Sequence, residues 1–411
     1  MEEPKRILGF EKNIFFTGLV SFFMDVSSEM IYPLVPLFLA SVLGVNKSVI
    51  GLIEGIAEST ASLLKVFSGW LSDRMGNRKN LMIAGYAIST LSRPITATAG
   101  GWPQMLGARF VDRLGKGIRT APRDAIIAES CDAAHLARSF SFHRSMDTMG
   151  AVVGPAIAML VLGMFSNNYS LVFWLSMAPA TIAVLIIIFY ITEKKKPAGA
   201  AGAELPKLTL AALDGKGKFF ILIAALFALG NSSDAFLILR AQQAGIATPL
   251  IPAVYLLFNL IYALSAIPAG MVADRFGKKR LILLGFVLFS ALYCGFAVAE
   301  TPAAIWVLFC LYGIFMGLTE GIQKAFLATI IPPEFRATAF GLFATAVGLA
   351  ALPASLIAGW LWDHVSPSAT FYFGSATAAL AAILFILLIV FSNSPSRSAG
   401  QRASYHAEPY S

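Results

Sequence analysis

Carboxyl groups stand in pairs at a helical spacing inside long apolar stretches of this sequence. Asp25 and Glu29 are four residues apart, and so are Glu54 and Glu58. Side chains at this spacing share one face of a helix, one turn apart. Two carboxylates held together away from water repel each other, and binding of a proton by one of them relieves the repulsion. The pairs are therefore candidates for groups that take up and release protons.

A second run of charges follows one face of a helix expected over residues 102–126. Its members step by four, three and four residues and are Asp112, Lys116, Arg119 and Arg123. Arg109 and Arg113 lie in the same stretch. A guanidinium group can bind a carboxylate or a phosphate through two parallel hydrogen bonds. Arg113 could also neutralise Glu29 or Glu58 in one conformation and lose that partner in another.

The second half of the chain holds fewer such residues. Asp234 and Glu320 lie within apolar stretches, and Asn259 and Tyr255 could line a cavity that suits an organic solute. The residues that we predict to bind substrate are Asp234, Glu54, Arg109, Arg113, Asn259, Tyr255 and Glu320. Those that we predict to exchange protons are Glu29, Asp25 and Glu58.

The elements that position these residues must cross a membrane. Of the 411 residues, 57% are hydrophobic and only 13% are charged, and the mean hydropathy is +0.73. A soluble globular protein carries about 25% charged residues, and a membrane-spanning helix needs about 20 mostly apolar ones. The composition therefore excludes an ordinary soluble protein, a disordered chain and a small disulfide-rich domain.

A structural interpretation of the charges stays open beside the functional one. A charged group at the centre of a membrane helix costs about 2.5–3.5 kcal/mol on insertion scales, so each one needs a reason to be there. Acids and bases nearly balance in these stretches, which is typical of ion pairs that neutralise one another. Asp25 and Glu29 have no base beside them on their own helix, which favours a transport role, with Glu29 as the first choice.

Apolar runs between Gly, Pro and charged residues predict twelve transmembrane helices. Their expected limits are 13–40, 48–71, 80–100, 102–126, 141–163, 170–191, 218–240, 250–272, 281–300, 302–327, 337–361 and 369–391. The predicted fold class is an all-α polytopic membrane protein with two pseudo-symmetric six-helix bundles. The bundles comprise residues 1–192 and 218–391, joined by a cytoplasmic linker at 193–217 and followed by a tail at 392–411 that we expect to be disordered.

Basic residues gather in alternate loops, and this fixes the expected orientation. Lys194–Lys196 and Lys278–Arg280 lie in loops on one side, whereas Lys47 is almost alone on the other. Because cytoplasmic loops are enriched in Lys and Arg, both termini are predicted to be cytoplasmic, in the plasma (inner) membrane. The bases form no continuous face, so we expect no nucleic-acid partner.

The two halves repeat each other. Gly-x-x-x-Asp-Arg-x-Gly at residues 69–76 recurs at 270–277, an offset of 201 residues, and basic residues follow both copies. Ser27-Ser28-Glu29 has an echo in Ser232-Ser233-Asp234. Parallel repeats of this kind place the solute site near the middle of the bilayer, where the halves meet.

On these motifs the whole chain resembles the major facilitator superfamily. The loop motif at 69–79 is similar to the most diagnostic signature of that family, and Arg109 matches the arginine of its second motif. Gly150-x-x-x-Gly154-Pro155 is similar to the core of a motif found in proton-coupled exporters. The resemblance implies the twelve-helix fold and a central cavity lined by the first, fourth, seventh and tenth helices.

The resemblance further implies that the two loop motifs form a latch that stabilises the outward-open state. Asp73 would accept hydrogen bonds from Arg138 and from the first N–H groups of the helix expected at 337–361. The predicted latch residues are Gly69, Asp73, Arg74, Gly76, Arg78, Asp274, Arg275, Gly277 and Arg138. A purely structural interpretation of the basic members, as anchors at the cytoplasmic headgroups, stays open.

These observations predict a secondary active transporter that works by alternating access and exports a small organic compound or drug in exchange for protons. The alternative is proton-coupled uptake or exchange of an organic anion bound by the basic residues of the helix expected at 102–126, namely Arg109, Arg113, Lys116 and Arg119. A remote alternative is a receptor that transports nothing. The four histidines, His135, His143, His364 and His406, are expected in loops or at helix ends. Sequence motifs for zinc proteases, serine hydrolases and ATP hydrolysis do not occur, so neither an enzyme nor a cofactor is expected. The expected partners are protons, a small-molecule substrate and the lipid bilayer, and the expected state is a monomer.

Overall fold

The computed structural model describes residues 6–75, 77–130, 136–165, 167–193, 213, 215–331 and 336–393. The N-terminal half comprises β1 (Arg6–Ile7), β2 (Phe10–Glu11), α1 (Lys12–Ile31), α2 (Val35–Leu37), the π-helix η1 (Phe38–Val42), α3 (Lys47–Met75), α4 (Arg78–Ala97), α5 (Trp102–Glu129), α6 (Leu136–Met164), α7 (Tyr169–Leu175) and α8 (Met177–Tyr190). The C-terminal half comprises α9 (Gly215–Gly230), α10 (Ala235–Gln243), the 3-10 helix η4 (Thr248–Leu250), α11 (Ile251–Phe276), α12 (Lys278–Val298), α13 (Pro302–Ile330), α14 (Arg336–His364) and α15 (Pro367–Asn393).

Each of the twelve expected helices coincides with one helical stretch, but three of them are interrupted. The stretch expected at 13–40 breaks after Ile31, where Pro33 lacks the N–H that a continuous helix would use. The stretch expected at 170–191 breaks at Ser176, because Pro179 cannot donate to the carbonyl four residues earlier. The stretch expected at 218–240 breaks between α9 and α10, at a run of polar residues described below. A two-stranded hairpin, β1–β2, precedes α1 and was not expected in an all-α chain.

Within the described residues, nine helices are long and apolar enough to cross a membrane. The three helical stretches that fall outside this set are α3, α4 and α5. These three pack on one another, and they hold Glu54, Glu58, Arg93, Arg109 and Arg113. Because these charges face neighbouring helices rather than lipid, the low hydropathy of the three helices is compatible with a place inside a membrane protein.

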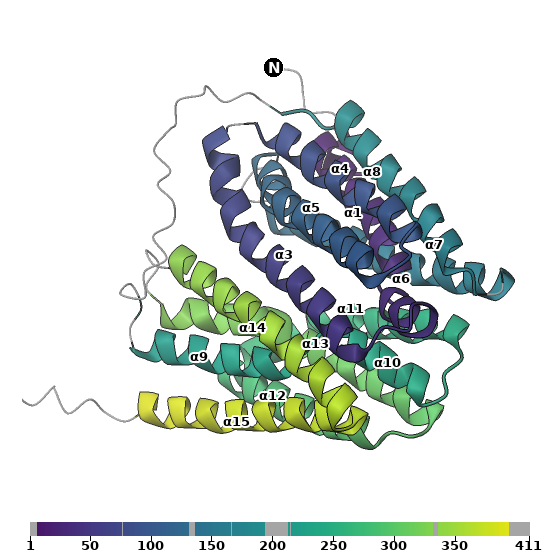
Figure 1. Ribbon diagram of the computed structural model, residues 1–411. Helices are drawn as coiled ribbons and strands as arrows, with labels where there is room; N and C mark the ends of the chain where they lie inside the picture. Colours follow the sequence, from purple (N-terminus) through teal and green to yellow (C-terminus); the bar gives the residue numbers. More distant parts are fainter. Residues whose placement is uncertain are drawn as a thin grey trace, which may run out of the picture.

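The helices form two groups, α1–α8 and α9–α15, which lie at an angle and meet where α3 and α14 run side by side (Figure 1). Small residues make this approach possible. A Cβ atom added at Gly51 would clash with the carbonyl oxygen of Ser355, and one added at Gly359 would clash with that of Lys47. Ser59 Oγ also donates a hydrogen bond to the Gly348 carbonyl, at 2.7 Å. The two halves therefore touch backbone to backbone along this line.

Hydrogen bonds also join the two halves near the start of α3 and the end of α14. The carboxylate of Asp363 accepts hydrogen bonds from the backbone N–H groups of Lys47 and Ser48, at 3.0 and 2.6 Å. Gln242 Nε2 donates to Ser41 Oγ at 2.9 Å. We call this region, residues 41–51 together with 242 and 355–363, the closed end.

Candidate functional site

The first acid pair lies against a pair of glycines. A Cβ atom added at Gly150 of α6 would come within 2.8 Å of Asp25 Cβ, and one added at Gly154 would come within 3.0 Å of Glu29 Cβ. Both pairs have the spacing of one helical turn, so α1 and α6 meet through acids on one side and glycines on the other. The exporter-like glycine motif thus packs directly on the two carboxyl groups.

Glu29 has charged neighbours but an incompletely satisfied carboxylate. Its Oε2 atom is buried and has no hydrogen-bond partner within the described part of the chain. Lys116 and Arg113 of α5, and Asp234 from the other half, lie close enough to interact with it electrostatically. Leaving such an atom unpaired costs about 1–3 kcal/mol or more, and a bound proton or a cationic ligand would remove that cost.

A polar chain continues from this pair along α6. Asp25 interacts electrostatically with Asp147, and Asp147 Oδ2 lies 3.6 Å from His143 Nδ1. The other ring nitrogen of His143, Nε2, is 2.6 Å from Ser21 Oγ. Asp147 Oδ1 is buried without a hydrogen-bond partner among the described residues, like the oxygen of Glu29. Carboxyl, imidazole and hydroxyl groups therefore follow one another away from Glu29.

The expectation that His143 lies in a loop or at a helix end is wrong. The helix α6 begins at Leu136 and not near 141, and the His143 side chain is only 4% exposed. A signal for this was present in the sequence, because His143, Asp147, Gly150 and Gly154 share one helical face.

The second acid pair is neutralised by two arginines. Arg109 Nε donates to Glu54 Oε1 at 3.0 Å, and Arg113 Nη2 lies 3.1 Å from Glu58 Oε1. Both arginines stand over the ring of Tyr32, with guanidinium carbons 5.5 and 5.9 Å from the ring centre. Two acids one turn apart on α3 thus match two arginines one turn apart on α5, and both arginine side chains are buried.

A third ion pair supports the first two. Arg93 of α4 lies 3.3 Å from the carboxylate of Asp112 on α5 and donates to Ser28 Oγ at 3.0 Å. Arg93 is buried and was not among the predicted site residues. It links α4, α5 and α1 close to the position of Glu29.

In the C-terminal half, the predicted residue Asp234 lies at the break between α9 and α10. Tyr312 Oη donates to Asp234 Oδ1 at 3.0 Å, and the N–H of Ser233 donates to Ser355 Oγ at 3.3 Å. In transporters, interrupted membrane helices expose backbone groups that bind substrate or ions. The break also coincides with the echo of Ser27-Ser28-Glu29, so the two halves place related polar residues on each side of their junction.

The remaining predicted binding residues differ in their surroundings. The ring of Tyr255 lies against that of Tyr32 across the two halves, tilted by 37° and with ring centres 5.4 Å apart. Asn259 Nδ2 donates to the carbonyl of Tyr255 on its own helix, at 3.0 Å. The side chain of Glu320 lies outside the described residues.

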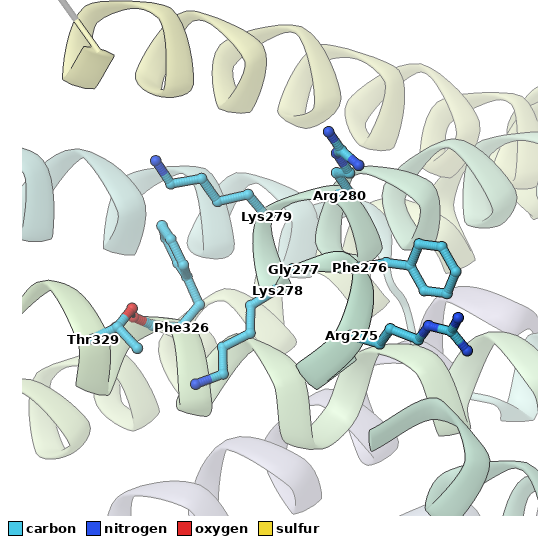
Figure 2. A pocket seen from close by; sticks show the side chains of 8 residues that line it. All are labelled: Arg275, Phe276, Gly277, Lys278, Lys279, Arg280, Phe326 and Thr329. Carbon is cyan, nitrogen blue, oxygen red and sulfur yellow. Dashed lines mark hydrogen bonds between the residues drawn. The ribbon is translucent and has the colours of Figure 1, made fainter. Parts of the chain in front are cut away.

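Most of the predicted latch lies outside the described part of the chain. Gly76 is not described at all, and nothing is described beyond the backbone for Gly69, Asp73, Arg74, Arg138 and Asp274. Arg78 is described and forms an ion pair with Glu129 at the end of α5. Arg275 and Gly277 line a basic pocket at the junction of α11 and α12 (Figure 2).

Comparisons with known proteins agree with this architecture. The family model described as Major Facilitator Superfamily matches residues 17–246 and 220–409. An uncharacterized MFS-type transporter of Methanocaldococcus jannaschii is 36% identical over 385 residues, covering 92% of this chain and 95% of the relative. The multi-drug resistance efflux pump PmrA homolog of Lactococcus lactis is 24% identical, covering 87% and 90%.

Solved structures share the fold at low sequence identity. A crystal structure of the nucleoside transporter NupG aligns with a TM-score of 0.77 at 14% identity, over 91% of this chain and 99% of the other. A crystal structure of the peptide transporter POT aligns with a TM-score of 0.76 at 14% identity, over 95% and 96%. The resemblance predicted from the sequence motifs is therefore confirmed, and the chain belongs to the Major Facilitator Superfamily of membrane transporters.

Proposed function

We propose that this protein exports small organic compounds in exchange for protons, with Glu29 as the group that exchanges the proton. The observation that carries the proposal is the contrast between the two acid pairs. Glu54 and Glu58 are matched by Arg109 and Arg113, whereas Glu29 keeps a buried oxygen without a hydrogen-bond partner among the described residues. A proton-coupled transporter needs a carboxyl group that can exchange one partner for another. Of Glu29, Glu54 and Glu58, it is Glu29 that has a buried oxygen able to take a proton or another partner.

The polar chain along α6 supports a route for the proton. From Glu29 it passes Asp25 and Asp147 and reaches His143, which lies nearer the start of α6. In the predicted orientation the start of α6 is cytoplasmic, so the chain would connect the centre of the protein with the cytoplasm. Histidine suits this role because its ring can accept a proton at one nitrogen and release it from the other.

The position of the closed end supports an inward-facing state. In the predicted orientation, with both termini in the cytoplasm and twelve spans across the plasma membrane, residues 41–51 and 355–363 lie at the outer face. The hydrogen bonds of Asp363 and the close approach at Gly51 hold the halves together there. Alternating access would require these contacts to part while the predicted latch forms at the opposite face. A monomer contains every group that this mechanism uses.

The character of the junction supports a substrate with an aromatic or apolar body and a cationic or polar group. Tyr32 and Tyr255 offer ring faces from the two halves, and Glu29 and Asp234 offer carboxyl groups beside them. Relatives described as a multi-drug resistance efflux pump homolog and as a multidrug resistance protein support export of such compounds.

The organic-anion alternative has less support. Arg109 and Arg113 would have to release Glu54 and Glu58 before they could bind an anionic substrate, and the Glu54–Arg109 pair is almost completely buried. Removing one partner of such a pair costs about 3–5 kcal/mol, which an incoming anion would have to offset.

The test is transport by the purified protein in proteoliposomes with an imposed pH gradient. We expect a lipophilic cation, tetraphenylphosphonium, to move against a proton flux, and we expect Glu29→Gln to make its transport independent of pH. Glu300→Gln removes an exposed carboxyl at the end of α12 and should keep the wild-type pH profile. A wild-type profile in Glu29→Gln would exclude Glu29 as the proton site, and flux of labelled benzoate without flux of the cation would favour the anion alternative.

A further inference from the structure

The polar chain along α6 continues beyond His143. The hydroxyl oxygen of Ser21 on α1 lies 2.6 Å from His143 Nε2, and it also accepts a hydrogen bond from Arg123 Nη1 at 3.4 Å. Arg123, on α5, donates from Nε to Asp124 Oδ1 at 3.0 Å. Ser21 and His143 are buried, whereas the side chain of Arg123 is 18% exposed and that of Asp124 is 43% exposed. The chain therefore leads from the interior to an exposed carboxylate in the last turns of α5.

The directions of these hydrogen bonds suit a neutral imidazole. A guanidinium group has five N–H donors and no acceptor, so Ser21 Oγ accepts from Arg123 and its own hydrogen can point to His143 Nε2. On the other side of the ring, Asp147 Oδ2 lies 3.6 Å from Nδ1. The ring proton of a neutral His143 therefore belongs on Nδ1, the nitrogen that faces the acid.

Opposite charges act on this ring. The acids that interact with it are Asp147 on α6 and Asp124 on α5, and the bases are Arg123 on α5 and Arg144 on α6. Arg123 has the strongest effect of the four. A second proton on His143 would place a positive charge beside this guanidinium, and a fixed arginine beside a pathway excludes protons in this way. Arg123 thus opposes the step that would carry a proton past the ring.

The position of Arg123 also suits a group that can move. Two of its nitrogens, Nε and Nη2, lie 3.0 and 2.9 Å from Asp124 Oδ1, whereas its hydrogen bond to Ser21 is longer. Because Asp124 is exposed and adjacent in sequence, the guanidinium can turn toward solvent while it keeps this carboxylate as its partner. Ser21 and His143 would then be open to water.

We propose that Arg123 is an electrostatic barrier that keeps protons from leaking along the polar chain when no substrate is carried. While its guanidinium lies beside Ser21, a positive charge on His143 is opposed. When it turns outward on Asp124, the chain opens to the cytoplasm in the predicted orientation. This inference rests on the proposed proton route and not on the identity of the substrate. An ion pair that only stabilised α5 would have no effect on proton leak.

The test measures passive proton entry into proteoliposomes that contain the full-length protein, a pH-sensitive dye and no substrate. Potassium and valinomycin carry the balancing charge. We expect Arg123→Gln to raise the protein-dependent rate about tenfold, because it removes the charge but keeps a side chain that can donate to Ser21. Arg123→Lys keeps the charge and should leak as little as the wild type. The matched control is Arg280→Gln, which removes an exposed arginine from the first turn of α12 and should also leave the rate unchanged.

A double variant shows whether the leak uses the polar chain. Arg123→Gln/His143→Gln should return the rate to that of the wild type, because no imidazole remains to pass the proton. A wild-type rate in Arg123→Gln, an equal rise in Arg280→Gln or a leak that persists in the double variant would overturn the barrier. Failure of the proposed function would appear elsewhere, in the pH profile of transport by Glu29→Gln, which the leak measurement does not use.

Discussion

The two halves of the molecule repeat each other in sequence but differ in what fills their interiors. The N-terminal half buries ion pairs, such as Glu54 with Arg109 and Arg93 with Asp112. The C-terminal half buries aromatic rings that pack on one another: the ring centre of Phe289 lies 4.8 Å from that of Phe227, edge to face, and 3.9 Å from that of Tyr293, stacked. The N-terminal bundle therefore adds buried ion pairs to its apolar core, whereas the C-terminal bundle packs mainly aromatic and aliphatic side chains.

We propose that this difference divides the work between the halves. An ion pair can exchange partners as helices move, and a proton can take the place of one partner. Aromatic pairs add about 0.5–1.5 kcal/mol each beyond the area they bury, and they have nothing to exchange. The N-terminal half is thus suited to proton chemistry, and the C-terminal half to a firm support that contributes Asp234 at the junction.

The largest effect is expected from removing one partner of a buried ion pair in the N-terminal half. Arg109→Met leaves Glu54 charged and alone among α3 and α5, and we expect a loss of stability of about 3–5 kcal/mol. Thermal unfolding of the purified protein in detergent micelles would measure it. The double variant Glu54→Gln/Arg109→Met should recover most of the loss, because no unpaired charge remains. If the double variant were no more stable than the single one, the pair would not act through charge.

A second prediction concerns the polar chain along α6. His143→Gln keeps a hydrogen bond to Ser21 within reach but cannot pass a proton, so we expect proton-linked transport to slow about tenfold. A pH-sensitive dye inside proteoliposomes would measure the rate. The control is His364→Gln at the exposed end of α14, whose ring contacts the carbonyl of Trp360. Unchanged proton flux in His143→Gln would remove the histidine from the route.

A third prediction concerns the aromatic packing in the C-terminal half. Phe289→Leu removes ring contacts with Phe227, Tyr293 and Phe315 and should cost about 1 kcal/mol of stability. We expect the C-terminal half to act as a structural support and to take no part in proton transfer. The pH profile of transport should therefore keep its wild-type midpoint. A shifted midpoint would show that the aromatic half takes part in coupling.

Much of the fold could be predicted from the sequence because hydropathy and helix length depend on local residues. The break before Asp234 was missed, although Asn231 to Asp234 are four polar residues in an apolar stretch and lie where transporter helices are often interrupted. Without a proline there, the apolar residues on both sides suggested one continuous helix.

The partners of the charges could not be predicted in the same way. The sequence indicates that acids and bases nearly balance, but ion pairs form between helices that are about 50 residues apart in the chain, as in Glu54 and Arg109. Which acid lacks a partner depends on how α1, α3 and α5 are rotated against one another. From the sequence, Glu29 is the first choice because Asp234 is its counterpart in the repeat, and the structure adds the contrast with Glu54 and Glu58.

The smallest expected effect is at the closed end, where the two halves touch. Asp363→Asn weakens hydrogen bonds from the N–H groups of Lys47 and Ser48 and from Ser48 Oγ, which lies 2.7 Å from the carboxylate. Since these groups are exposed to solvent, we expect a change of only about 0.5–1 kcal/mol, which shifts a two-state equilibrium about two- to fivefold. Distances between spin labels at the start of α3 and at the end of α14 should show the separated state more often.

The same variant tests whether the difference between the halves extends to their motion. If the bundles move as rigid bodies, Asp363→Asn should change the population of the two states without altering the distances within either bundle. A matched carboxylate-to-amide change, Glu300→Gln, alters an exposed side chain just after α12 and should leave that population unchanged. Should Asp363→Asn instead alter distances inside the aromatic bundle, that bundle would be a moving part, and the division of work between the two halves would be wrong.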